Sequence, residues 1–265
     1  GLVISSCAPA QNAGAPAPQD GPADAPTAVP PTTAATEAPV ANADPTATAM
    51  PSAAVEPTGL SSKVAIAKAE DYDRDRIYNA VRDMIDDLGG LGDVVRPGDR
   101  VAIKTNLTGG LGNEGPPGFS PMESFVTHPE VVRALGALAL DAGAGDVMIV
   151  EAVYQWGSYA QWGYEEIAEE IGATLIDLNS PEPYDDFVNA KVPGGGEIYE
   201  EYVFNPILQE IDVFMSAAKM KCHYTAGVTH SLKNLFGLVP AQFYKLSPQH
   251  GHRSEFHGPS NETAG

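Results

Sequence analysis

The segment THPEVVRALGALALDAGAGDVMIV, residues 127–150, contains the pattern that decides the fold. Pro129 stands in the first turn of a predicted helix, and apolar residues then recur at helical spacing as far as Gly143. The short apolar run Val147 to Val150 follows, after Gly143 and Gly145, as is typical of a buried strand. A helix that leads directly into a buried strand is the repeating unit of an α/β fold.

The same alternation extends to both sides of this segment. The predicted strands are residues 64–69, 101–103, 147–150, 174–178 and 211–216, and the predicted helices are residues 74–88, 129–143 and 164–171. This order predicts an α/β fold with an open, mostly parallel sheet and helices on both faces, a Rossmann-like three-layer arrangement. Turn residues within 180–205 predict an added hairpin, and the Gly- and Pro-rich loop 105–127 is long enough to be functional or mobile.

The first 62 residues have a different composition. They are dominated by Ala, Pro and Thr and contain neither Lys nor Arg. Such a segment buries too little apolar surface to offset the entropy of ordering it, so we predict a disordered linker over 1–62 and an α/β domain over 63–265. No apolar run is long enough to cross a bilayer.

Cys7 ends the stretch LVISSC, an apolar segment followed by small residues and a cysteine. This stretch resembles the lipobox at which bacterial lipoproteins are cleaved after a signal peptide and then lipidated. On that interpretation Cys7 is a lipidation site, the chain is anchored to a bacterial membrane in the cell envelope, and the Pro-rich linker is a spacer for an extracytoplasmic domain. The alternative is a stray cysteine in an unstructured tail.

The charge balance constrains the kind of ligand. The chain has 15 basic and 35 acidic residues and a net charge of −20, which disfavours binding to nucleic acid or to anionic lipid headgroups. From Lys219 to the end, however, the basic residues outnumber the acidic ones. A locally positive site on an acidic protein favours a small anionic ligand as the partner.

Polar residues follow the predicted strands. In open parallel sheets, ligands bind beyond the carboxyl ends of the strands, so a group of such residues predicts a site. The alternative is that strand ends are polar because they meet water. The residues concerned are Lys104, Asn106, Glu151, Asp177, Asn179, Lys219, Lys221 and His223.

The stretch Lys219-Met220-Lys221-Cys222-His223 is the most specific of these signals. In an extended chain the two lysines and the histidine share one face, while Met220 and Cys222 share the other, where Cys222 is expected to face inward. Neighbouring cations lower one another's pKa or recruit an anion, so they serve either proton transfer or anion binding. The alternative is a solvated basic edge.

A short helix is predicted within Thr229–Gly237. Its amino end offers backbone amides to an anion, and Lys233 and Asn234 lie one turn further on. His230 fits equally well as a surface residue.

Metal binding is a separate hypothesis. His250, His252 and His257 could supply imidazole ligands to a divalent metal, although no carboxylate or cysteine stands at ligand spacing beside them, and a solvated His-rich loop is the alternative. The chain has two cysteines, too few for an iron–sulfur cluster or a cysteine-ligated zinc site.

Six motifs occur in order along the chain: KTNL (104–107), THPEVV (127–132), DAGA (141–144), GYEE (163–166), KMKCH (219–223) and KNLFG (233–237). Taken together, they resemble the family known as domain of unknown function 362. Some members carry a ferredoxin-like module, whose cysteines are absent here, so no iron–sulfur cluster is expected from this chain. The family pattern also continues beyond the Lys-Asn-Leu-Phe-Gly motif, so the sequence looks truncated at its carboxyl end as well as at its amino end. The resemblance implies an α/β fold and leaves the reaction open.

Two main functional hypotheses follow. The first is an enzyme that acts on a small anionic substrate, a carboxylate or a phosphate. The second is a lipid-anchored protein that binds an anion or a metal without catalysis, and a third is a domain that docks onto another envelope protein. The predicted catalytic residues are His223, Lys221 and Lys219, and the predicted ligand-binding residues are Lys104, Asn106, Lys233, Asn234 and Glu151.

Overall fold

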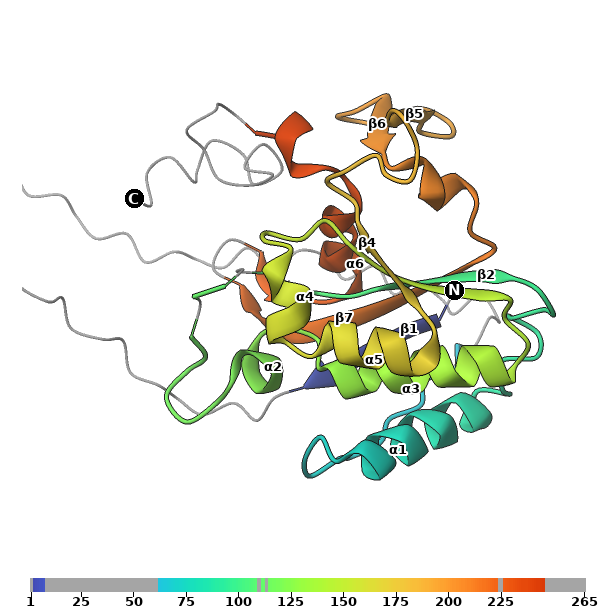
Figure 1. Cartoon of the computed structure of the whole chain (residues 1–265), viewed down its shortest axis with the longest axis vertical. Coiled ribbons are helices and arrows are strands. Elements are labelled where there is room, and N and C mark those ends of the chain that lie inside the picture. The colour runs from blue at the N-terminus through green and yellow to red at the C-terminus, as the bar shows by residue number, and fades with distance from the viewer. Residues whose placement is uncertain (1, 8–61, 109–110, 113, 224–225, 246–265) are drawn as a thin grey trace, which may run out of the picture. The chain divides into compact units, whose positions relative to one another are not determined.

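The computed structural model describes residues 2–7, 62–108, 111–112, 114–223 and 226–245. Their centre is a sheet in which β1, β7, β2, β3 and β4 lie side by side in that order, all parallel, with β8 paired antiparallel to the end of β7 (Figure 1). The strands are β1 (Leu2–Cys7), β2 (Arg100–Lys104), β3 (Asp146–Glu151), β4 (Thr174–Asp177), β7 (Val213–His223) and β8 (Gly227–Thr229). The predicted α/β fold with a mostly parallel sheet is confirmed.

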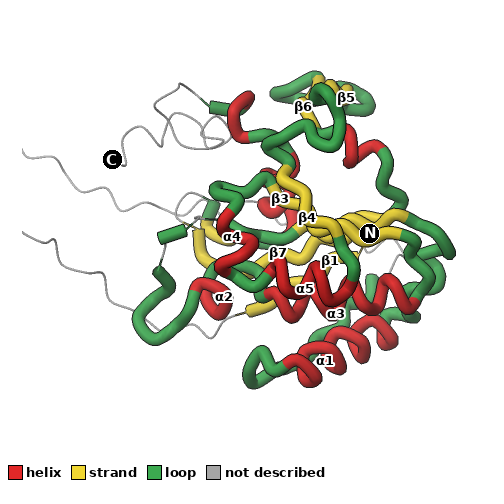
Figure 2. Tube along the Cα trace, viewed as in Figure 1, coloured by secondary structure: helices red, strands yellow, loops and turns green. Residues whose placement is uncertain are grey.

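Longer helices cover one face of the sheet (Figure 2). They are α1 (Arg74–Asp87), α3 (Pro129–Asp141) and α5 (Tyr164–Ile171). The short helix α4 (Gly157–Gln161) directly precedes α5. The amphipathic pattern of α1 buries Ile77, Val81 and Ile85 in the same core as alternate residues of β2. Asp73 caps α1 by accepting a hydrogen bond from the Arg76 amide. The boundaries of these three helices agree with the sequence prediction to within two residues.

The opposite face carries shorter elements. A second core joins the other side of β2 and β3 to Ile207 and Leu238. The elements here are η1 (Pro206–Gln209), α6 (Ser231–Asn234), η2 (Leu235–Leu238) and η3 (Ala241–Phe243). The predicted hairpin is also present, as the antiparallel pair β5 (Val188–Lys191) and β6 (Glu201–Phe204).

The order of the strands identifies the edge of the sheet at which α/β proteins commonly bind ligands. The chain runs from β2 to β3 to β4 in one direction across the sheet, and β7 then returns to the other side of β2. The carboxyl ends of β2 and β7 therefore flank the point at which the winding direction reverses. In open α/β sheets this reversal opens a crevice in which ligands bind.

The predicted strand 64–69 is wrong for this structure. The segment forms neither helix nor strand and pairs with no described strand, and Val64 and Ile66 are 79% and 89% exposed. The outer edge of β7 is instead paired with Leu2–Cys7, a segment expected to belong to a disordered tail. Residues 8–61 lie outside the described part of the chain. Within the described part, no helix is both long enough and apolar enough to cross a membrane.

Candidate functional site

A buried ion pair joins the ends of β2 and β3. Lys104 and Glu151 are 1% and 5% exposed, and Lys104 Nζ lies 2.8 Å from Glu151 Oε2. The ammonium also donates to the Thr105 carbonyl at 2.6 Å, and the Leu107 amide donates to the carboxylate at 3.1 Å. A buried pair persists only when hydrogen bonds like these satisfy its remaining atoms. The pair is therefore held in a fixed position, its two charges cancel, and it forms the structural floor of the site.

Gly237 lies against this pair. A Cβ at this position would lie 2.6 Å from Lys104 Nζ and closer still to Glu151 Oε1. The backbone is fixed in place, because the Gly237 carbonyl accepts a hydrogen bond from the Ala152 amide at 3.0 Å. Glycine is required here for close approach, since its φ lies outside the left-handed region.

Two asparagines connect three elements around the ion pair. Asn234, on α6, donates to the Lys104 carbonyl at 3.3 Å and to Ser216 Oγ at 3.0 Å. Its Oδ1 accepts from Asn106 Nδ2 at 3.3 Å, and Asn106 Oδ1 in turn accepts from Lys221 Nζ at 2.6 Å. These bonds fix the orientation of both amides and link β2, α6 and β7 into one polar network.

Lys221, a member of this network, has a strongly altered acid–base behaviour. Burial lowers its pKa from 10.5 to about 7, and the positive charges of nearby lysines add to that effect, while Glu151 opposes it. The ammonium donates to Asn106 Oδ1 and to the Phe125 carbonyl, both at 2.6 Å. Lys221 can therefore gain or lose a proton near neutral pH without leaving its position.

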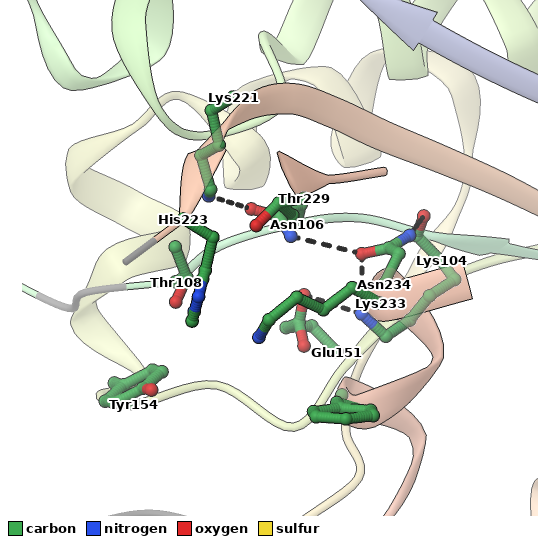
Figure 3. Close-up of a pocket in the computed structure, with 12 residues that line it drawn as sticks. Lys104, Asn106, Thr108, Glu151, Tyr154, Lys221, His223, Thr229, Lys233 and Asn234 are labelled. Atoms are coloured by element: carbon green, nitrogen blue, oxygen red, sulfur yellow. Dashed lines mark hydrogen bonds and ion pairs between the residues drawn. The ribbon is translucent and has the colours of Figure 1, made fainter. Parts of the chain in front are cut away.

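These groups surround a small pocket beyond the ends of β2, β3 and β7 (Figure 3). Its volume is about 90 Å³, which suits a small ion or several waters better than a nucleotide. Lys233 and His223 extend into the same opening (Figure 3), and Lys233 Nζ lies 4.8 Å from the centre of the Phe236 ring. The lining residues are Lys104, Asn106, Thr108, Glu151, Tyr154, Lys221, His223, Thr229, Lys233, Asn234, Phe236 and Gly237.

Eight residues were predicted to take part in catalysis or ligand binding, and seven of them line the pocket. Lys219 is the exception: it is fully buried and does not line the pocket. Its Nζ donates to the Tyr72 hydroxyl at 2.8 Å and to the carbonyls of Glu123 and Met122 at 3.0 and 3.4 Å. It fastens α2 (Pro121–Ser124) to β7, and so holds the loop whose Phe125 carbonyl binds Lys221.

The profile of the family described as a domain of unknown function (DUF362) matches residues 101–264, more than half of the chain. The chain belongs to the DUF362 family. The thylakoid-associated protein sll1697 of Synechocystis sp. is 27% identical over 184 residues, which are 69% of this chain and 52% of that protein. The chain thus spans about half the length of this curated relative. No solved structure matches the chain.

The end of β7 in this DUF362 chain differs from the sequence prediction in one respect. Cys222 is exposed, although it was expected to face inward, and Met220 on the same side is 38% exposed. The reason is that β7 is much longer than its neighbour: Lys104, the last residue of β2, pairs with Ser216. Ala218 is the last buried residue on this side of β7, and Met220 and Cys222 lie beyond it. Lys219 and Lys221 lie on the other face and both bind carbonyls of the 122–125 segment.

His223 has a defined hydrogen-bonding role in the DUF362 pocket. Its Nδ1 accepts a hydrogen bond from the Ala226 amide at 3.1 Å. In the neutral ring this places the proton on Nε2. His223 is thereby oriented as a donor on the side of Nε2.

Thr127 is a structural residue of the site that sequence reasoning missed. Its hydroxyl donates to the Ala217 carbonyl at 2.6 Å and accepts from the Asn106 amide at 3.0 Å, and its carbonyl accepts from the Tyr164 hydroxyl at 2.7 Å. It therefore joins β2, β7 and α5 just behind the pocket. Its position immediately before the helix-starting His128-Pro129 was visible, but its contacts with other strands were not.

Two other strand-end residues serve the fold. Asp177 accepts hydrogen bonds from the amides of Val153 and Asn179 at 3.3 and 2.9 Å, and burial raises its pKa. Asn179 accepts from the Ala241 amide at 2.9 Å. They tie β4 to neighbouring loops, and neither lines the pocket.

The metal hypothesis is not settled by the described residues. His250, His252 and His257 all lie outside them. Among the residues that are described, no three His, Cys, Asp or Glu side chains form a group that could hold a metal ion.

Proposed function

We propose that this DUF362 domain is an enzyme that binds a small carboxylate or phosphate in the pocket and transfers a proton through Lys221. The observation that carries the proposal is the position of Lys221, half-buried at the pocket wall with a pKa of about 7. A general acid or base works best when its pKa is close to the working pH. Perturbed groups of this kind gather at functional sites.

The charges around the cavity favour an anion. Glu151 is neutralised by Lys104, to which it is paired at 2.8 Å. Lys221 and Lys233 then contribute positive charge with no second carboxylate among the pocket-lining residues. A buried anion is stable only when cations and hydrogen-bond donors surround it, and this cavity supplies both.

Each residue has a distinct role in this proposal. Lys233 holds the anionic group of the substrate, and Lys221 gains or loses the transferred proton. His223 donates from Nε2 to a second oxygen of the substrate. Asn106 holds Lys221, while Lys219 is reassigned from catalysis to positioning, because it lies outside the pocket.

Anion affinity tests the binding step. Sulfate and acetate are suitable probes because neither titrates between pH 6 and 9, and calorimetry measures their affinities. Lys233→Met and Lys221→Met are expected to weaken binding at least ~10-fold, since each removes a charge-assisted contact of about 1.5–3 kcal/mol. Lys191→Met, at an exposed lysine of β5, is the matched control and leaves affinity unchanged. Equal affinities in all four proteins would exclude the pocket as the anion site.

The pH dependence tests the role of Lys221. The wild-type affinity for sulfate is expected to fall as the pH rises above 7, because Lys221 loses its positive charge there. In Lys221→Met this fall disappears. Turnover is then tested by NMR on a panel of small carboxylates and phosphate esters. A wild-type protein that binds these compounds but converts none of them is a binding protein, which is the alternative function.

The cellular location is a further part of the proposal. We propose that Cys7 carries a lipid that anchors the chain to a bacterial membrane in an extracytoplasmic position. The support is the lipobox-like stretch that ends at Cys7, together with a relative named for its association with thylakoids, which are membranes. Metabolic labelling with a fatty acid tests the lipid anchor. The label is expected to be lost in Cys7→Ser and kept in Cys222→Ser. Label that survives Cys7→Ser would contradict the anchor.

A further inference from the structure

The outer edge of β7 is paired with the start of the chain. Leu2–Cys7 forms a parallel ladder on it, from Leu2 opposite Met215 to Cys7 opposite Met220. The opposite edge of β7 pairs with β2, which fixes β7 in the sheet independently of Leu2–Cys7. Cleavage of the chain before Cys7, as the lipobox resemblance implies, would remove most of this strand. The edge would then present unpaired backbone groups.

A second segment has the pattern needed to fill that edge. Val64–Ala69, with the sequence VAIAKA, has the same length as LVISSC and carries a large apolar residue at its first and third positions, as that stretch does. It forms neither helix nor strand, and the side chains of Val64 and Ile66 are 79% and 89% exposed. Large apolar side chains that lie exposed side by side mark surfaces that pack against a partner.

The position of Tyr72 places this segment within reach of β7. The Tyr72 hydroxyl accepts a hydrogen bond from Lys219 Nζ at 2.8 Å, near the carboxyl end of the ladder. Two residues separate Ala69 from Tyr72, and an extended chain covers at most about 3.6 Å per residue. Ala69 therefore lies within reach of the end of β7 at which a parallel strand would have to finish.

The chain direction also fits. A strand on the outer edge of β7, followed by α1 and then β2, crosses the sheet in the same direction as β2, α3 and β3 do. α1 and α3 pack together on the same face. The two crossovers would therefore have the same hand, as parallel β-α-β units require.

We propose that the outer edge of β7 is a strand-acceptor site, and that Val64–Ala69 occupies it whenever Leu2–Cys7 is removed or displaced. In the register of Leu2–Cys7, Val64 pairs with Met215 and Ile66 with Ala217. Paired residues of parallel strands project to the same face, so Val64 and Ile66 join the core beneath α1 and α3.

Hydrogen exchange in the full-length chain tests this exchange of strands. Ile4→Pro removes a backbone donor and blocks strand pairing by Leu2–Cys7. The amides of residues 64–69 are then expected to exchange at least ~10-fold more slowly than in the parent chain, because they enter a ladder. Fast exchange at 64–69 combined with faster exchange at 215–220 would show an empty edge and overturn the proposal.

A pair of matched substitutions gives a second readout. Ile66→Glu is expected to lower the melting temperature in the Ile4→Pro chain and to leave it unchanged in the parent, where Ile66 is exposed. Ile198→Glu is the control, because Ile198 is 85% exposed and belongs to no strand. Equal effects of Ile66→Glu in both chains would overturn the proposal.

Cross-linking covers the case in which Ile4→Pro fails to fold. Ala67→Cys with Ala218→Cys, in a chain that lacks residues 1–6 and carries Cys7→Ser and Cys222→Ser, places two cysteines opposite each other in the proposed register once Leu2–Cys7 no longer occupies the edge. Adjacent strands lie about 4.8 Å apart, within the Cα spacing that a disulfide spans. Mild oxidation is expected to trap the docked segment. Cross-linking no greater than that of Ile198→Cys with Ala218→Cys would overturn the proposal.

Discussion

Replacing Gly237 by alanine is the sharpest test of the site's construction. The new methyl group would lie 2.6 Å from Lys104 Nζ and 2.8 Å from Lys104 Cε, and closer still to Glu151 Oε1. Real Cβ atoms essentially never approach other heavy atoms below 3.0 Å, so either the ion pair or the η2 backbone has to move. The backbone is held by the Ala152 amide, which leaves the pair to move.

The expected loss of stability follows from that geometry. Overpacking a core by one methylene costs about 1–3 kcal/mol, and disrupting a buried ion pair costs about 3–5 kcal/mol. Because the pair is displaced rather than deleted, we expect a loss of about 3 kcal/mol. For a domain of this size, that corresponds to a fall in melting temperature of about 6–12 °C.

Urea unfolding followed by far-UV circular dichroism measures the change directly. Gly92→Ala is the matched control, because a Cβ there meets no atom within 4 Å and its φ is not left-handed. It is expected to change the unfolding free energy by less than about 0.5 kcal/mol. If Gly237→Ala were as mild as Gly92→Ala, Gly237 would not pack against the Lys104–Glu151 pair as described.

Two further predictions concern the segment behind the pocket. Burial, with a smaller contribution from the Lys219 charge, lowers the pKa of His128 from 6.5 to about 4, so folding favours its neutral form. His128 should therefore contribute stability above pH 6.5 that is lost as the pH falls towards 4. His128→Asn keeps an acceptor for the Glu130 amide. Between pH 7 and 4.5, the urea midpoint of this variant should fall less than that of the parent chain, because the variant has no imidazole to protonate. Equal falls in the two proteins would contradict the lowered pKa of His128. Tyr164→Phe removes a buried hydrogen bond to the Thr127 carbonyl, and we expect a loss of about 1–2 kcal/mol by urea unfolding. An unchanged midpoint would mean that water replaces the hydroxyl.

Sequence periodicity predicted the helices well because they depend on local information. The apolar stripe of α1 and the proline at the start of α3 are both set within a few residues. The strand predicted over 64–69 failed because a strand also needs a free neighbouring edge. The apolar residues of 64–69 are spaced as in a strand, but this spacing does not show whether Leu2–Cys7 already occupies the outer edge of β7.

The site was predictable as a region and less so as a set of contacts. Strand ends in an α/β sheet converge, so Lys104, Glu151 and Lys221 could be grouped before their distances were known. The close approach of Gly237 to the ion pair had no local signal, since a glycine after a short helix also fits an ordinary helix end. Cys222 was misplaced because strand alternation says which face a residue takes, without saying where the core on that face ends.

Lys219 and Lys221 show how the same local pattern produces two roles. They stand two residues apart on one face of β7, and both donate to carbonyls of the 122–125 segment. An ammonium group has three donors. Lys219 uses three oxygen acceptors, from Tyr72, Met122 and Glu123, and is enclosed by them. Among the described residues, Lys221 has two acceptors and borders the cavity, which leaves a third donor for the ligand that we propose. The difference in acceptor count, which no sequence pattern encodes, is the reason that we propose Lys221, and not Lys219, as the residue that meets a ligand.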